Sequence, residues 1–203
     1  MKFPQREIDY LTLMEALKDY AYPRDRVTKL LKRGALSRVK KGLYLWNEVD
    51  EPYSREILAN LIYGPSYVSR EYALSLYGLI PEAVPLVTSV TTGRNKHFDT
   101  VAGAFSYRSL PVEYYSPGIS YMAGASGRGY MVASPAKALF DMLYLNAPDL
   151  REGEIPAYFF ENLRMEPDDV AGIDFSEILV LIGSCLKPSI HALALYLKEG
   201  KHG

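Results

Sequence analysis

The chain has little of the chemistry from which disulfide and metal sites are built. It has one cysteine in 203 residues, which excludes a disulfide framework and any zinc or iron–sulfur site made of cysteines. Its three histidines, His97, His191 and His202, lie far apart and lack the spacing of metal ligands. We therefore expect no metal site and no cofactor.

Long apolar stretches are missing as well. No segment reaches the roughly 18 apolar residues that a membrane span needs. Residues 1–10 mix charges and contain no apolar run, unlike a signal peptide. With 48% hydrophobic and 23% charged residues, the composition is that of an ordinary globular chain. The sequence predicts a soluble, cytoplasmic protein without a membrane partner.

The formal net charge of −1 hides two strongly charged blocks. From Lys18 to Lys41, nine lysines and arginines face two aspartates, which gives a net +7. From Asp141 to Glu177, ten carboxylates face two arginines, which gives −8. Charge blocks bear on partners rather than on fold. The first block favours an anionic partner, and the second would repel it.

Local signals in the basic block predict two helices. Thr12 and Glu15 have the spacing of a capping box, which predicts a helix over residues 10–19. Pro23 suits the first turn of a second helix over residues 24–33, because proline lacks a donor that this position does not use.

A hairpin is expected directly after the second helix. Gly34 supplies the left-handed residue that ends a helix. Two β-prone runs then meet at Lys40-Lys41-Gly42, where glycine permits a tight turn. The order helix, turn, basic helix and hairpin is typical of a winged helix-turn-helix. In that motif the second helix enters the major groove and the wing lies along the backbone.

This interpretation predicts a set of residues that contact DNA. They are Arg24, Arg26, Thr28, Lys29, Lys32, Arg33, Arg38, Lys40 and Lys41. Arg26, Thr28 and Lys29 lie near the start of the second helix and are expected to meet base edges. Lys40 and Lys41 are expected to contact phosphates from the hairpin. The alternatives are a solvated surface, or a face that binds RNA or protein.

The remaining residues mix strand and helix signals. Helices are expected over residues 52–63, 70–77, 135–145, 175–186 and 189–199, and strands over residues 84–91, 104–110, 112–115, 119–123 and 130–133. The predicted fold class is α+β, with an N-terminal winged helix-turn-helix over residues 1–50. A mixed α/β domain follows over residues 51–203, with a helical C-terminus from about residue 146.

Tyrosine is unusually frequent, with 17 of the 25 aromatic residues. Tyrosine is favoured on half-buried surfaces such as interfaces and ligand grooves. The alternative is a tyrosine-rich core whose hydroxyl groups reach its rim. The sequence leaves these two interpretations open.

No catalytic constellation is evident. The segment from Gly124 to Gly129 lacks the Gly-Lys-Ser/Thr of a phosphate-binding loop, which favours a hairpin. Cys185 lies in an apolar stretch and is expected to be a buried thiol. The remaining polar candidates are given structural places: Asp168 and Asp169 in a solvated loop, His97 in an exposed loop, and His191 on an apolar helix, in the core or at its rim. We assign no catalytic residues and expect that the chain is not an enzyme.

Three segments resemble the AbiEi family, the antitoxins and transcriptional regulators of type IV, abortive-infection toxin–antitoxin systems. The first is RDRVTKLLKRGALSRVKKGLYLW, residues 24–46, which is similar to the N-terminal module of that family. The second is SYVSREYALSLYGLIPEAVPLVTSVTTGR, residues 66–94, with a Gly-Leu-Ile-Pro corner. The third is VASPAKALFDML, residues 132–143, similar to the family's strand-Pro-helix unit.

The resemblance implies a DNA-binding autorepressor of its own promoter, at repeated half-sites. It also implies an antitoxin whose C-terminal part counters a nucleotidyltransferase toxin encoded beside it, without a requirement for direct contact.

Two other functions remain open at this point. One is a winged-helix transcriptional regulator whose α/β part senses a small ligand, which a defined apolar pocket would favour. The other is a protein-interaction module that docks a basic partner on its acidic C-terminal part.

Overall fold

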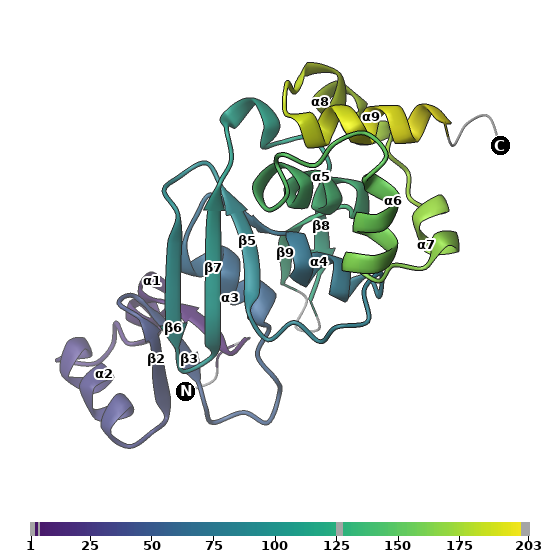
Figure 1. The fold of residues 1–203 in the computed structure, drawn as a ribbon. Coiled ribbons are helices and arrows are strands. Elements are labelled where there is room, and N and C mark those ends of the chain that lie inside the picture. The colour runs from purple at the N-terminus through teal and green to yellow at the C-terminus, as the bar shows by residue number, and fades with distance from the viewer. Residues whose placement is uncertain (1–2, 4, 125–127, 200–203) are drawn as a thin grey trace.

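The computed structural model describes residue 3 and residues 5–124 and 128–199. They form an α+β fold with a three-stranded antiparallel sheet and a six-stranded mixed sheet (Figure 1). The strands are β1 (Glu7–Asp9), β2 (Leu36–Lys40), β3 (Leu43–Trp46), β4 (Ser66–Val68), β5 (Val87–Thr91), β6 (Lys96–Thr100), β7 (Gly103–Ser109), β8 (Ile119–Ala123) and β9 (Gly129–Ala133). The α-helices are α1 (Tyr10–Ala16), α2 (Pro23–Lys32), α3 (Arg55–Ile62), α4 (Arg70–Leu76), α5 (Pro135–Leu145), α6 (Ile155–Ala157), α7 (Pro167–Ala171), α8 (Leu179–Ser184) and α9 (Pro188–Glu199). Short 3₁₀-helices are η1 (Val112–Tyr114) and η3 (Ser176–Ile178), and η2 (Tyr158–Asn162) is a π-helix.

The N-terminal helices pack on the smaller sheet around a core of their own. The strand order in this sheet is β1-β3-β2. Leu13 and Leu17 from the α1 region, Leu30 from α2, and Ile8 and Trp46 from the sheet are all buried in one cluster. This cluster is separate from the larger core that contains the rest of the buried apolar residues.

The smaller sheet is nevertheless buried on both faces. Side chains alternate between the two faces of a strand. Tyr44 and Trp46 of β3 belong to the small core, whereas Leu43 and Leu45 of the same strand belong to the large one. The two cores therefore share this sheet as a common wall, and the hairpin β2–β3 is part of the packed interior.

The six-stranded sheet has the order β6-β7-β5-β4-β9-β8. The pairs β4–β9 and β5–β7 are parallel, and the other neighbours are antiparallel. Helices α4 and α5 pack against each other, while α3 packs against β4 and β9. The fully buried Tyr67 and Tyr107 and the nearly buried Tyr72 place tyrosine in this core, so the core interpretation holds for these three.

The C-terminal helices lie at the opposite end of the molecule from α2. In Figure 1, α2 is at the lower left, and α7, α8 and α9 are at the upper right, beyond the large sheet. Within the described part of the chain, no helix is long and apolar enough to cross a membrane.

Several expected elements differ from those observed. The first helix is capped by Asp9, which lies one residue before Tyr10, instead of by a capping box at Thr12 and Glu15. Residues 112–115, expected to be a strand, contain a 3₁₀-helix that begins directly after Pro111, a residue without the N–H that a strand ladder uses.

The C-terminal part and the loops also need correction. His97 lies on strand β6 and not in a loop. Asp168 and Asp169 lie on the short helix α7, although they are exposed as expected. The helix expected over residues 175–186 is divided into η3 and α8, and Cys185 follows it as a buried residue.

The predicted glycine-rich hairpin and one histidine reach beyond the described residues. Strands β8 and β9, which flank residues 124–129, pair antiparallel up to Ala123 and Gly129. Residues 125–127 themselves, and His202, lie outside the described residues.

Candidate nucleic-acid interface

Local sequence signals fix the two N-terminal helices. The Asp9 carboxylate accepts a hydrogen bond from the backbone N–H of Thr12 at 2.8 Å, which satisfies one free donor of the first turn of α1. Pro23 begins α2, as expected for a first-turn proline. Gly34 has a φ of 77°, a left-handed conformation that ends the helix region at little steric cost.

The outward face of α2 carries most of its charge. Val27 and Leu30 are buried against the small core, and at 100° per residue the opposite face holds Asp25, Lys29 and Lys32. These three side chains are exposed, and no described residue forms an ion pair with either lysine. Both ammonium groups are therefore available to an anionic partner.

Arg24 and Thr28 of α2 are both exposed, and the hydroxyl of Thr28 already has a partner. Arg24 is exposed next to Tyr22, whose side chain is 75% exposed. The hydroxyl of Thr28 donates to the backbone carbonyl of Arg24 at 3.2 Å, so it already has a partner within the helix. A hydroxyl can exchange such a local bond for one to DNA at small cost.

Two arginines of the predicted set have protein partners. The guanidinium of Arg26 lies 5.3 Å from the ring centroid of Tyr20, in cation–π geometry, and is half-buried. Arg33 forms an ion pair with Glu48 at 2.8 Å, with both side chains about half exposed. Exposed pairs contribute little stability, so a phosphate can replace Glu48 as the partner of Arg33.

The hairpin turn is tight and lies against α1. Gly42, with a φ of 86°, forms the turn, and its carbonyl accepts the N–H of Tyr10 at 2.9 Å. Arg38 and Lys41 remain exposed. Lys40 is half-buried and donates its ammonium to the backbone carbonyl of Ile62 at the end of α3.

Lys40 therefore has a structural contact that the sequence did not predict. Burial lowers its pKa from the usual lysine value. Its ammonium links the hairpin to the larger part of the protein, 22 residues away in the sequence. Of the two lysines expected to contact phosphates, Lys41 is the one directed to solvent.

Six cations of the predicted set are exposed on α2, on β2 and in the residues that follow them, and the acidic block lies away from α2. We define the basic surface by its exposed cations, which are Arg24, Lys29, Lys32, Arg33, Arg38 and Lys41. Residues 149–177 of the acidic block lie in the C-terminal helical part, at the other end of the molecule (Figure 1). Asp141, the first carboxylate of that block, is completely buried and does not contribute to an acidic surface.

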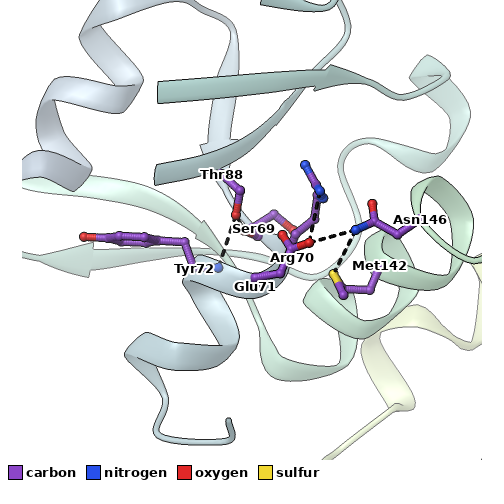
Figure 2. A network of polar contacts seen from close by, with 7 residues as sticks. All are labelled: Ser69, Arg70, Glu71, Tyr72, Thr88, Met142 and Asn146. Carbon is purple, nitrogen blue, oxygen red and sulfur yellow. Dashed lines mark hydrogen bonds and ion pairs between the residues drawn. The ribbon is translucent and has the colours of Figure 1, made fainter. Parts of the chain in front are cut away.

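The larger part of the protein contains a second polar cluster, around the start of α4 (Figure 2). The carboxylate of Glu71 pairs with Arg70 at 3.1 Å and accepts a hydrogen bond from the Asn146 amide, after α5, at 2.7 Å. Thr88 of β5 donates to the carbonyl of Ser69 at 2.7 Å. The cluster therefore joins α4 to both α5 and β5.

Arg70 adopts a strained backbone conformation in this cluster. Its φ is 61°, in the left-handed region that disfavours side chains other than glycine. The residue is buried, and its Nε has no hydrogen-bond partner among the described residues. Burial and the nearby Glu71 raise the pKa of Tyr158 to about 12. The contacts of Arg70 and Glu71 hold α4 in place. Neither of the two described cavities is lined by these residues.

A third polar cluster lies inside the core. Lys137 and Asp141, one turn apart on α5, are completely buried and pair at 2.6 Å. Asp141 also accepts hydrogen bonds from the hydroxyl groups of Tyr67 at 2.9 Å and Ser69 at 2.7 Å. The Lys137 ammonium donates further to the carbonyl of Tyr114 at 2.7 Å. Although the residue types suit catalysis, the cluster is closed to solvent and its charges are satisfied, which indicates a structural role.

Comparison with known protein families and with curated proteins gives no match for this chain.

Proposed function

We propose that the chain binds double-stranded DNA, with α2 in the major groove and the hairpin β2–β3 beside it, as a winged helix-turn-helix. The observation that carries this proposal is the outward face of α2, where Lys29 and Lys32 are exposed opposite a buried apolar face and form no ion pair with the residues that the structure describes. A helix that is anchored in this way can enter the major groove without unfolding.

The number of exposed cations sets the expected strength of the electrostatic attraction. Six lysines and arginines form the basic surface, and about three to six of them are expected to meet phosphates. Each phosphate contact contributes about −0.9 to the slope of log K against log salt, so we expect a slope of roughly −3 to −5. The acidic C-terminal part lies at the other end of the molecule from α2 (Figure 1), and exposed charges farther apart than the Debye length of roughly 8–10 Å are largely screened.

We further propose that this DNA binding serves autorepression, and that the chain is an antitoxin of the AbiEi type. The support is the resemblance of three segments in the family's order. In the fold, the second and third segments form neighbouring units: β4, α4 and β5 come from the second, and β9 and α5 from the third. Val68 pairs with Val132 across these units, and α4 packs on α5. The proposal assigns no catalytic step to the chain.

A ligand-sensing regulator is the second candidate, because a defined apolar cavity exists in the C-terminal part. It measures about 500 Å³ and is lined by α7, the segment after it, and α9. This volume is in the range of small-molecule sites. The cavity is partly open to solvent and is lined by one carboxylate, Asp174, which favours a polar or cationic occupant over a purely apolar one.

DNA binding is tested with the full chain and a duplex taken from the region upstream of its own gene. Lys29→Ala should weaken binding to this duplex by about 1–3 kcal/mol, and binding to a random duplex far less. Lys198→Ala on α9 is the matched control, since it removes one exposed lysine at the far end. Equal losses for both variants, or equal losses on both duplexes, would contradict base readout by α2.

The antitoxin role is tested by growth of cells that express the neighbouring toxin gene from an independent promoter. Lys29→Ala with Lys32→Ala should abolish repression of the chain's own promoter but leave protection from the toxin intact, because the acidic end is unchanged. The full chain is used because removing residues 1–50 would take Val39, Leu43 and Leu45 out of the larger core. Absence of protection by the wild-type chain would refute the antitoxin role and leave the DNA-binding proposal in place.

A further inference from the structure

The apolar cavity at the C-terminal end has the form of a docking groove. Its walls include Phe160 from η2, Val170 from α7, Phe175, and Tyr196 from α9. Leu179 at its edge is 51% exposed. Apolar surface of this kind, hollowed and still in contact with water, is typical of a site that a partner covers.

The rim of the groove is acidic. Asp174 lines it directly, and the N–H of Ser176 stabilises the Asp174 carboxylate and lowers its pKa, so this group is charged at neutral pH. Asp168 is exposed on α7 directly after the lining residue Pro167, whereas Asp169, at 100° per residue, lies on the side of α7 that faces away from the cavity. The nearest arginine along the chain, Arg164, is paired with Glu82. We call the cavity and this rim the acidic groove.

The opposite end of the same chain carries complementary features. Tyr22 projects from the turn between α1 and α2 with 75% of its surface exposed, and Leu11 on α1 is 79% exposed. Arg24, Lys29 and Lys32 are exposed on α2 after this turn. An apolar knob next to several cations matches an apolar groove with a carboxylate rim, both in hydrophobicity and in sign of charge.

The two complementary surfaces cannot meet within one molecule. They lie at opposite ends of the fold, separated by the six-stranded sheet (Figure 1). We propose that two copies of this chain associate head to tail, with the Tyr22 turn and the basic face of α2 of one copy in the acidic groove of the next. Such a contact is heterologous, so it leaves one free basic end and one free groove in every oligomer that does not close into a ring.

Head-to-tail association and DNA binding compete for the same face of α2. The Lys29 and Lys32 ammonium groups that contact the groove are those assigned to DNA, a consequence that rests on the proposed function. Oligomers should therefore dissociate when duplex DNA is added. The association should also weaken at high salt, because the charges involved are exposed and screened.

Mixing of two variants tests the head-to-tail geometry. The head variant is Lys29→Glu with Lys32→Glu, and the groove variant is Asp168→Lys with Asp174→Lys. Each should be monomeric alone in sedimentation at low salt, whereas the wild type grows in mass with concentration. An equimolar mixture should form a complex of two chains and stop there, because the head variant supplies an intact groove and the groove variant an intact head.

Controls distinguish loss of the head-to-tail contact from misfolding and from the effect of a changed net charge. Asp99→Lys with Glu113→Lys makes the same charge change on exposed residues outside the groove and should leave association unaltered. If the groove variant unfolds, Leu179→Lys at the edge of the groove replaces it, with circular dichroism as the check on folding.

The outcomes are distinct. A wild type that stays monomeric at low salt and high concentration overturns the proposal, as does association that both charge variants retain. A mixture that remains monomeric overturns the head-to-tail arrangement. Because mass is measured without DNA, these results are independent of whether the chain binds DNA at all.

Discussion

Replacing Asp141 with alanine should destabilise the protein severely. The change leaves the fully buried Lys137 ammonium without its carboxylate, which typically costs about 3–5 kcal/mol. It also removes the acceptor of the hydroxyl groups of Tyr67 and Ser69, and an orphaned buried polar group costs about 1–3 kcal/mol. We expect a loss of at least about 4 kcal/mol, out of the roughly 5–15 kcal/mol by which domains are stable.

The assay is urea denaturation followed by circular dichroism, together with thermal unfolding. A loss of about 4 kcal/mol corresponds to about 8–16 °C in Tm for a chain of this size. Asp149→Ala, at an exposed carboxylate, should change stability by no more than about 0.5 kcal/mol. The pair Lys137→Met with Asp141→Leu should be less harmful than Asp141→Ala alone, since neither charge then remains buried. A loss below about 1 kcal/mol for Asp141→Ala would refute this reasoning.

Three further predictions follow from the described contacts. Lys41→Ala should reduce the magnitude of the salt slope of DNA binding by about 1, while Lys40→Ala should leave the slope unchanged and lower stability in urea, because Lys40 bonds to the end of α3. Asp25→Ala should tighten binding to random duplexes, since it removes the one carboxylate on the outward face of α2, and it should relax any preference for cytosine at one position. Binding titrations on random duplexes and on single-base variants of the upstream duplex measure these two effects. Weaker binding to random duplexes would contradict the placement of Asp25 at the DNA. Stability should fall as pH rises from about 10 to 12. Burial raises the pKa values of Tyr115 and Tyr158 to about 12, so the folded state retains protons that the unfolded state has released. Urea midpoints across this range, with tyrosinate absorbance, provide the check, and constant midpoints would contradict the prediction.

The N-terminal helix and hairpin could be predicted closely because their determinants are local. Pro23 fixes the start of α2 within one residue of the expected position, and Gly34 adopts the left-handed conformation that ends it. Gly42 likewise forms the expected turn between β2 and β3. Proline fixes its own φ and glycine permits a positive φ, so the local sequence is enough to predict where these elements begin and end.

The shortest strands could not be predicted because their determinants are distant. β4 has three residues, and it forms where Val68 meets Val132 of β9 and Tyr67 meets Val90 of β5. His97 was expected in a loop, yet β6 exists because the edge of β7 accepts it as a partner. Three residues carry too little periodicity to indicate a strand on their own.

The charge of the candidate site could be predicted from the sequence, but the partners of individual side chains could not. The basic block predicted which residues are cations, and six of the nine predicted residues are exposed cations. The contacts of Lys40 with Ile62 and of Arg33 with Glu48 join residues that are 22 and 15 positions apart. Only the tertiary fold reveals that Lys40 is directed inward while Lys41 is directed outward.

The salt dependence of DNA binding by the full chain tests the central claim most directly. Affinity for a duplex from the chain's own upstream region is measured by fluorescence anisotropy over a series of salt concentrations. We predict a slope of log K against log salt of roughly −3 to −5, which Lys32→Ala on α2 with Lys41→Ala in the hairpin turn should reduce in magnitude by about 2. Absence of binding at low salt, or a slope that these two substitutions leave unchanged, would contradict DNA binding through α2.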